Sequence, residues 1–316
     1  MKLIIRVLKY FFISIGILAI IVTSLFGYRD IPLEELKLKY AQAPSSFVAL
    51  AGMDVHYRDE GESNDSIPIV LIHGTGSSLH TFDDWVNELK NDYRVIRMDL
   101  PGYGLTGPFP NRDYSINAYL DFIKQFLDEQ AIDQCIIGGN SLGGQIAWRF
   151  TVNHPQMVSK LILINAAGYP SQAESEPLAF KAAKTPVIKN ILTFITPRFI
   201  ARSSVENVYA DKNKVTEELV TRYFELTLAP GNRQAFIDRF SAIKTPDAHL
   251  QISNINHPTL VLWGDQDRLI PVENAERFHQ DLPNDTLVIL ENVGHVPMEE
   301  SPDQSLEVVR SFLATK

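Results

Sequence analysis

The sequence predicts an α/β protein built on a mostly parallel, eight-stranded sheet with helices on both faces. Apolar runs alternate with amphipathic stretches along the chain, which is the order expected for parallel strands joined by crossover helices. The run 67–72 is apolar throughout, so helices are expected over both of its faces. A long stretch without strand-like runs, 167–256, interrupts this alternation and is predicted to be an inserted helical cap.

Each expected element follows from its own pattern of side chains. Residues 53–57 alternate apolar and polar positions, as a half-exposed antiparallel strand does, and they pair with a preceding run at 47–50. Residues 114–129 carry apolar side chains at helical spacing. Strands are expected at 47–50, 53–57, 67–72, 94–98, 135–137, 161–164, 259–263 and 286–290, and helices at 81–91, 114–129, 145–150, 274–280 and 305–313.

Prolines separate the helical stretches of the predicted cap. Its many large apolar side chains are expected to pack it onto the sheet, and some of them to wall an apolar substrate pocket. Its helices are expected at 177–184, 187–195, 214–228 and 233–243, and its apolar residues include Phe180, Leu192, Phe194, Phe199, Ile200, Tyr223, Phe224, Phe236 and Phe240.

The first thirty residues differ from the rest of the chain. Residues 10–26 carry no charge, and this run is at the short end of the ~17–25 residues that span a membrane as a helix. It is longer than the roughly 7–15 apolar residues of a cleavable signal, and no small-residue cleavage site precedes Arg29. The pattern at 1–30 favours a single-pass anchor, with residues 3–27 in the membrane, over a removed signal.

Charges on either side of the apolar run bear on its orientation. Lys2, Arg6 and Lys9 precede it and favour an N-terminus left in the cytoplasm, although Arg29 and other cations follow it. Residues 31–46 are expected to form a polar linker. The catalytic domain is therefore expected on the periplasmic or extracellular side.

Composition excludes some classes of function. The chain is 45% hydrophobic and 21% charged, as ordinary globular proteins are, and its net charge of −9 argues against a nucleic-acid partner. The single cysteine, Cys135, cannot form an internal disulfide and is expected to be buried at a strand start. No phosphate-binding glycine loop or clustered metal-ligand spacing occurs, so no cofactor and no metal are expected. The sequence gives no signal for the oligomeric state.

The segment around Ser141 predicts a nucleophile. Residues 139–143 fit the G-x-S-x-G pattern, with an apolar run before them and a helix-like run after them. A serine on so sharp a strand-to-helix turn has a strained backbone, and glycines on either side remove clashes with neighbouring side chains. The hydroxyl then stands near backbone N–H groups at the start of a helix, where negative charge is favoured.

A serine nucleophile needs a base and an acid that orients the base, in the chain order serine, acid, histidine. His295 follows the last predicted strand, and Gly294 allows the chain to turn inward there. Asp267 is assigned as the acid because it lies further into its loop than Asp265, which is expected to cap the turn. The other histidines beyond the elbow, His154, His249, His257 and His279, are expected to be surface or packing residues.

An oxyanion hole requires two N–H groups aimed at the developing negative charge. One is expected from Leu142, the residue after the nucleophile, and the other from the loop after the first central strand. Thr75 is the preferred donor in that loop, with Gly76 as the second choice. His73 is expected to be structural, with its ring bonded to the loop backbone.

Five motifs in this order resemble those of the α/β-hydrolase superfamily over residues 47–314. The resemblance implies an α/β-hydrolase core at 47–166 and 257–316, with the cap at 167–256 between its two parts. It also implies that the second aspartate of W-G-x-x-D, Asp267, is the triad acid, and that the reaction is ester hydrolysis. The motifs are H-G-T-G at 73–76, D-L-P-G-Y-G at 99–104, the elbow at 139–143, W-G-D-Q-D at 263–267 and G-H at 294–295.

Within the superfamily, the elbow and the final loop are most similar to esterases and lipases. These include monoacylglycerol-lipase-like proteins, and an N-terminal membrane helix also occurs in that branch. Haloalkane dehalogenases and epoxide hydrolases place an aspartate where this chain has Ser141. Carbon–carbon-bond hydrolases of aromatic ring-cleavage products share the serine and the triad order, and are the alternative enzyme. A non-catalytic binding protein is disfavoured because every triad position is filled.

Overall fold

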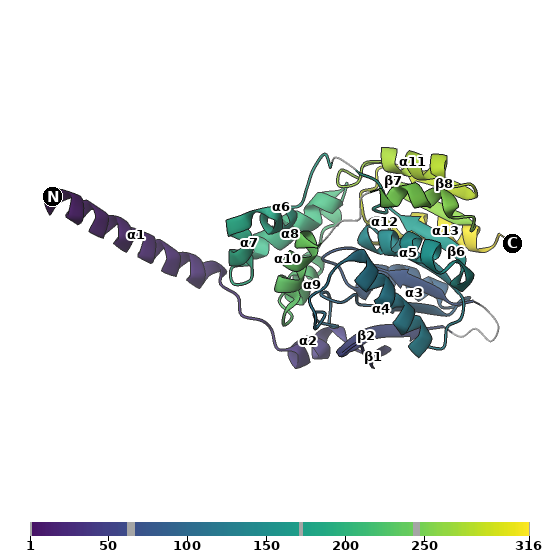
Figure 1. The fold of residues 1–316 in the computed structure, drawn as a ribbon, viewed down its shortest axis with the longest axis horizontal. Helices are drawn as coiled ribbons and strands as arrows, with labels where there is room; N and C mark the ends of the chain where they lie inside the picture. Colours follow the sequence, from purple (N-terminus) through teal and green to yellow (C-terminus); the bar gives the residue numbers. More distant parts are fainter. Residues whose placement is uncertain (1, 62–66, 171–172, 243–246, 316) are drawn as a thin grey trace.

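The computed structural model describes residues 2–61, 67–170, 173–242 and 247–315. Parts of the predicted loop at 59–66 and of the predicted cap at 167–256, including Ile243 at the end of its last predicted helix, lie outside the described residues. The ribbon in Figure 1 shows a layered body from which one helix projects.

The body is built on one eight-stranded sheet, as the sequence predicts. The first two pairings, β1 with β2 and β2 with β4, are antiparallel, and the other pairings are parallel. The predicted fold class is therefore confirmed. In sheet order the strands are β1 (Ser45–Leu50), β2 (Met53–Glu60), β4 (Val95–Met98), β3 (Ile69–Ile72), β5 (Cys135–Asn140), β6 (Val158–Ile164), β7 (Thr259–Gly264) and β8 (Asp285–Leu290).

Helices cover both faces of the sheet, which explains why β3 is apolar throughout. Val70 and Ile72 belong to the core cluster shared with α4 (Ile116–Glu129) and α5 (Leu142–Asn153). Ile69 and Leu71 belong to the opposite cluster, with α3 (Asp83–Leu89) and α13 (Pro302–Leu313). The remaining helices of the body are α11 (Glu273–Asp281) and the short α12 (Pro297–Glu300).

Strand register brings the loops that carry the candidate residues to one edge. Ile72 at the end of β3 lies opposite Gly139 of β5, and Asn140 lies opposite Ile164 of β6. Farther along the sheet, Gly264 lies opposite Leu290. Because parallel strands end at the same edge, the chain leaves β3, β5, β7 and β8 toward one side, where ligands bind in such sheets.

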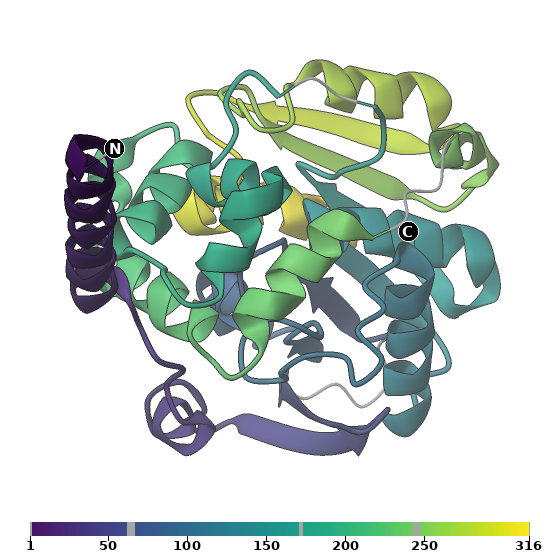
Figure 2. The ribbon, with the colours of Figure 1, turned by 60° about the vertical axis from the view of Figure 1, so that its left-hand side comes forward.

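Between β6 and β7 the chain forms helices that lie beside the sheet edge (Figures 1 and 2). Helix α8 was not expected from the sequence. Its adjacent serines and Val205 are weak helix formers, and the helix is held by packing against α6 and α9. The helices are α6 (Leu178–Lys184), α7 (Pro186–Leu192), α8 (Arg198–Val208), α9 (Glu217–Thr227) and α10 (Asn232–Ser241).

At the N-terminus, α1 (Lys2–Phe26) projects away from the body (Figure 1). Its segment Ile4–Phe26 has a mean hydropathy of 2.2 and is long and apolar enough to cross a membrane, a criterion that a signal sequence also meets. The polar stretch that follows contains a helix, α2 (Leu33–Tyr40). This helix forms because Leu36 and Tyr40, one turn apart, are buried against Leu226.

The end of α1 is joined directly to the cap. Gly27 forms an isolated bridge with Ile195, and the N–H of Thr196 donates to the carbonyl of Phe26 at 3.1 Å. The ring of Phe26 also meets the ring of Phe199 edge to face, with 6.2 Å between centroids. The apolar helix and the cap therefore meet without an intervening linker.

Candidate active site

The turn between β5 and α5 holds Ser141 in a strained conformation. Its φ of 56° and ψ of −114° are unfavourable for a residue with a side chain. A Cβ on Gly139 would lie 2.3 Å from the carbonyl carbon of Gly143, and a Cβ on Gly143 would lie 2.0 Å from the carbonyl oxygen of Ile72. The two glycines of the sequence motif are therefore required by close backbone packing.

His295 and Asp267 lie together at the same sheet edge. The Nδ1 of His295 is 2.6 Å from Oδ2 of Asp267, and both side chains are buried. The other oxygen, Oδ1, accepts the N–H groups of Leu269 and Ile270, both at 2.9 Å. A carboxylate held in this way fixes the imidazole with its Nδ1–H toward the acid and leaves Nε2 free to accept a proton.

The second aspartate of the same loop, Asp265, has a different place. Its N–H donates to the carbonyl of Leu290, and its Oδ1 lies 3.4 Å from the N–H of Val293. Asp265 thus bonds the backbone at the turn, whereas Asp267 faces the histidine.

Three polar residues that the sequence analysis did not single out support this pair. Asn165 Nδ2 donates to Oδ2 of Asp267 at 2.7 Å, and Asn140 Nδ2 donates to the carbonyl of His295 at 2.9 Å. The buried carboxylate of Glu300 accepts the N–H of Gly294 at 2.7 Å. Asn140 and Asn165 could have been found from the sequence, because each is a polar residue at the carboxyl end of a predicted strand.

The loop after β3 faces Ser141 across a cavity. Thr75, Gly76, Ser141 and His295 all line this cavity, and Leu142 begins α5 beside them. A Cβ on Gly74 would lie 3.1 Å from the Cβ of Ser141, so glycine permits the close approach of this loop to the elbow. The structure thus brings the predicted oxyanion donors to the same site as the predicted nucleophile.

His73 is held by the backbone on both ring nitrogens. Its Nδ1 donates to the carbonyl of Gly74 at 2.8 Å, and its Nε2 accepts the N–H of Leu100 at 2.9 Å. Burial lowers the pKa of His73, which favours the neutral ring that this pattern needs. The ring therefore joins two loops and does not line the cavity.

The cavity has a volume of about 140 Å³ and lies between the sheet edge and the cap. Its wall is mainly apolar and comes largely from helices α6 to α10 of the cap. The apolar side chains of the cap in this wall include Phe180, Leu192, Ile200, Val205, Val208 and Phe236.

One charged side chain of the cap, Arg233, is part of the cavity wall. Its Nη2 donates to Oδ1 of Asp30 at 2.6 Å, and its Nη1 donates to the carbonyl of Tyr28 at 2.9 Å. Nη1 also lies 3.4 Å from Oγ1 of Thr196, another residue of the wall. The charge of this buried guanidinium is therefore compensated by the segment that follows α1.

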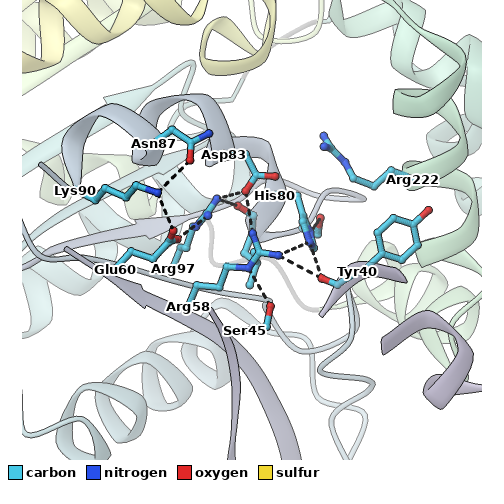
Figure 3. A network of polar contacts seen from close by, with 12 residues as sticks. Tyr40, Ser45, Arg58, Glu60, His80, Asp83, Asn87, Lys90, Arg97 and Arg222 are labelled. Atoms are coloured by element: carbon cyan, nitrogen blue, oxygen red, sulfur yellow. Dashed lines mark hydrogen bonds and ion pairs between the residues drawn. The ribbon is translucent and has the colours of Figure 1, made fainter. Parts of the chain in front are cut away.

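A second Ser–His–Asp set occurs away from this cavity. Ser45 Oγ is 2.9 Å from Nε2 of His56, and Nδ1 of His56 is 2.7 Å from Oδ2 of Asp99. Burial would raise the pKa of Asp99, but the rings of His56, His73 and His80 together outweigh burial and hold this pKa well below its usual range. Arg58 also contacts Ser45, with its Nε donating to Oγ at 2.9 Å (Figure 3).

The other residues considered from the sequence do not form a further reactive site. Burial raises the pKa of the Cys135 thiol to about 12, as expected for an inert core cysteine. His279 is exposed beside Asp285, and His257 bonds the carbonyl of Pro155. Across residues 2–61, 67–170, 173–242 and 247–315, no group of three or more His, Cys, Asp or Glu side chains is arranged to hold a metal ion.

Known hydrolases are similar to this chain over most of its length. A 2-hydroxy-6-oxo-2,4-heptadienoate hydrolase of Pseudomonas putida is 26% identical over 278 residues, which are 85% of this chain and 96% of that protein. Lipase 1 of Psychrobacter immobilis is 27% identical over 256 residues, 78% of this chain and 76% of that protein.

Among solved structures, a putative lipase from Acinetobacter baumannii superposes with a TM-score of 0.74 at 26% identity. This match covers 90% of the present chain and 97% of the other. A family model described as the alpha/beta hydrolase fold matches residues 67–302, which include the elbow, the aspartate loop and the histidine loop. The chain therefore belongs to the α/β-hydrolase family.

Proposed function

We propose that this protein is a serine hydrolase that cleaves carboxylic esters. The observation that carries the proposal is the strained Ser141 turn, which opens on the same apolar cavity as the ring of His295 with Asp267 behind it. Ser141 is the nucleophile, His295 the base and Asp267 the acid that orients it. The N–H groups of Leu142 and Thr75 are assigned as oxyanion donors, with Gly76 as the alternative to Thr75.

The reaction then proceeds by two acyl transfers. His295 removes the proton from Ser141 as its Oγ attacks the ester carbonyl, and the backbone N–H groups bind the oxyanion. The imidazolium, stabilised by Asp267, gives this proton to the alcohol as it leaves. A water molecule then attacks the acyl-enzyme with His295 as base, and the acid is released. Asn165 and the two loop N–H groups keep Asp267 in position throughout.

The cavity wall favours an apolar acyl group. Its cap residues are mainly aliphatic and aromatic, and the charge of Arg233 is already paired with Asp30. The relative from Pseudomonas putida acts, by its name, on a heptadienoate, which carries a carboxylate. A cavity without an unpaired cation binds such an anion poorly, which disfavours this substrate here. Carbon–carbon-bond hydrolysis therefore ranks second, and the similarity to that relative is the observation that keeps it as a candidate.

A series of p-nitrophenyl esters from acetate to palmitate tests the proposal. The full-length chain in detergent should hydrolyse members of the series, and Ser141→Ala should lose this activity. Parallel assays with a 2-hydroxy-6-oxo-2,4-dienoate measure the alternative. Hydrolysis of the dienoate by a folded protein that is inert on every ester would replace ester cleavage by carbon–carbon cleavage.

We further propose that α1 anchors the protein in a membrane with the body on the periplasmic or extracellular side. The support is the apolar length of Ile4–Phe26 and the cations Lys2, Arg6 and Lys9 near its start. Protease added to spheroplasts should digest the body. A body that stays protected until the cells are lysed would reverse the orientation.

A further inference from the structure

The outer surface of the cap carries a concentration of exposed apolar side chains. Outside α1, ten large apolar residues are exposed in the described part of the chain, and five of them fall between 178 and 199. Scattered exposed apolar residues are normal, but several on helices that pack together, here α6, α7 and α8, indicate an interaction surface. We call these five residues the outer cap face: Leu178, Ile188, Ile191, Phe194 and Phe199.

This face adjoins the end of the apolar helix. Phe26, the last residue of α1, packs its ring on Phe199 of the outer cap face and bonds the backbone of Thr196. Figure 2 shows α1 beside the cap helices, and Figure 1 shows it projecting from the cap end of the body. A helix that leaves a bilayer at Phe26 therefore places segment 194–199 at the bilayer surface.

Charge in the same segment is complementary to anionic lipid headgroups. Residues 177–205 contain five basic side chains and no acidic one, in a chain whose net charge is −9. Basic residues beside exposed apolar ones are the pattern of surfaces that lie in the membrane interface. The five are Lys181, Lys184, Lys189, Arg198 and Arg202. Lys184 forms an ion pair with Glu176, and Arg198 and Arg202 form ion pairs with Glu217, so the attraction to anionic headgroups is argued from Lys181 and Lys189.

The outer cap face is also separated from the candidate active site by one layer of helix. Leu178 is exposed and its neighbour Ala179 lines the cavity; Ile191 and Leu192 are related in the same way. Phe199 is exposed, and the next residue, Ile200, lines the cavity. Because a helix with its side chains is about 10–12 Å across, a lipid at the outer face lies one helix diameter from the cavity.

We propose that the outer cap face lies in the headgroup region of the bilayer that α1 spans, and that the substrates of Ser141 are ester lipids of that leaflet. The inference rests on the proposed anchor and on the proposed ester hydrolysis. Interfacial segments of this kind bury their apolar side chains about 5–10 Å deep. The cap would then take its acyl substrate directly from the lipid phase.

Depth-dependent quenching tests the docking. Full-length variants Phe194→Cys, Ile13→Cys and Leu250→Cys are labelled with an environment-sensitive fluorophore and placed in nanodiscs holding one chain each. The nanodiscs contain phosphatidylethanolamine, phosphatidylglycerol and a lipid with a doxyl group, placed near the headgroup in one set of nanodiscs and near the middle of the acyl chain in another, because Ile13 lies near the middle of Ile4–Phe26. Leu250 is the matched control because it is 67% exposed, against 72% for Phe194, and lies between α5 and α11, away from the cap face. The unmodified chain, whose Cys135 is buried, is the labelling blank.

Loss of fluorescence at Ile13 and Phe194, with none at Leu250, supports the proposal. Quenching at Ile13 but not at Phe194 overturns the docking while leaving the anchor intact. No quenching at Ile13 overturns both, because α1 is then not in the bilayer. One chain per nanodisc removes a second copy of the chain as the cover of Phe194.

Activity tests the substrate class separately. The double variant Ile188→Asp/Phe194→Asp changes two residues that do not line the cavity. This variant should hydrolyse soluble p-nitrophenyl butyrate at the rate of the unmodified chain. It should hydrolyse a monoacylglycerol held in the nanodisc about tenfold or more slowly than the unmodified chain, because two apolar contacts with lipid are lost. Leu250→Asp should change neither rate. Equal rates of the double variant and the unmodified chain on the lipid overturn the inference, whereas an unmodified chain inert on both esters overturns the proposed function.

Discussion

The two Ser–His–Asp sets of this chain share a buried Asp–His contact and differ in the surroundings of the serine. His295 faces Asp267 at 2.6 Å, and His56 faces Asp99 at 2.7 Å. In both sets the carboxylate accepts two further backbone N–H groups; for Asp99 these come from Leu79 and Leu105. The chain therefore contains two buried Asp–His pairs in which the carboxylate is held by further hydrogen bonds.

The serines differ. Ser45 lies in an ordinary strand, and its Oγ, close to His56, also accepts a bond from Arg58. Ser141 lies on a left-handed turn at the start of a helix and faces a cavity with the loop that holds Thr75. The comparison predicts that a serine becomes reactive through the backbone turn, the nearby N–H groups and the cavity, and not through the Asp–His pair alone.

Removing each serine breaks the comparison most directly. Ser141→Ala should lower kcat for ester hydrolysis by about 10⁶-fold, the scale on which such triads lose activity without their nucleophile. Ser45→Ala should leave kcat unchanged and cost about 1 kcal/mol of stability, because His56 loses a hydrogen bond. Burst and steady-state assays measure kcat of both variants, and urea unfolding midpoints measure their stability. The reverse outcome would move the nucleophile to Ser45.

Neutralising each acid gives the next largest effect. Asp267→Asn should lower kcat about 10⁴-fold with little change in fold, because the amide favours the wrong imidazole tautomer. Asp99→Asn should instead cost about 3 kcal/mol of stability and spare kcat, because a buried His–Asp pair is broken. Asp265→Asn is the matched control in the aspartate loop. A severe loss of kcat in that control and a mild one in Asp267→Asn would exchange the roles of the two aspartates.

Acid should weaken the region around the second set. Burial lowers the pKa of His80 to about 4, so the unfolded chain binds a proton there at a higher pH than the folded chain does. The neutral His80 ring therefore contributes fully to the free energy of unfolding above the unfolded pKa of about 6.5. This free energy should fall by about 2 kcal/mol between pH 7 and pH 5. Urea unfolding of His80→Gln should show a flatter pH dependence than the unmodified chain. Parallel slopes for the two proteins would contradict this assignment.

The smallest expected effect belongs to Asn165. Asn165→Ala removes the bond of 2.7 Å to Asp267 but leaves the two backbone bonds to the same carboxylate. A hydrogen bond to a charged group is worth about 1.5–3 kcal/mol, and the two remaining bonds to the carboxylate keep the loss near the low end of this range, so kcat should fall about tenfold. Steady-state assays measure this, and an unchanged KM would show that Asn165 positions the acid without contacting substrate. A kcat equal to that of the unmodified chain would leave Asn165 without a positioning role.

The sequence predicted what local patterns encode. The sheet, the elbow around Ser141 and the approach of His295 to Asp267 follow from apolar runs, from the glycines of tight turns and from the meeting of parallel strand ends. These features depend on neighbours in the chain, or on an edge that all parallel strands share. The roles of the residues as catalysts stay predictions.

Features that depend on distant packing could not be predicted in this way. Helix α8 is held by contacts with other cap helices, and α2 forms because Leu36 and Tyr40 find apolar partners far along the chain. The bond from Arg233 to Asp30 joins residues 203 positions apart. The set of Ser45, His56 and Asp99 also depends on packing between separate segments, and only Asp99 among its members lies in one of the sequence motifs.

The Arg233–Asp30 contact has a consequence for soluble forms of the protein. Cutting the chain at residue 31 to remove the hydrophobic helix would also remove Asp30 and the carbonyl of Tyr28, the main acceptors of the Arg233 guanidinium. The substrate cavity would then acquire an unpaired cation, and substrate preference would shift toward acids and other anions. A form that begins at Gly27 keeps the native wall, so where the chain is cut decides which specificity an assay records.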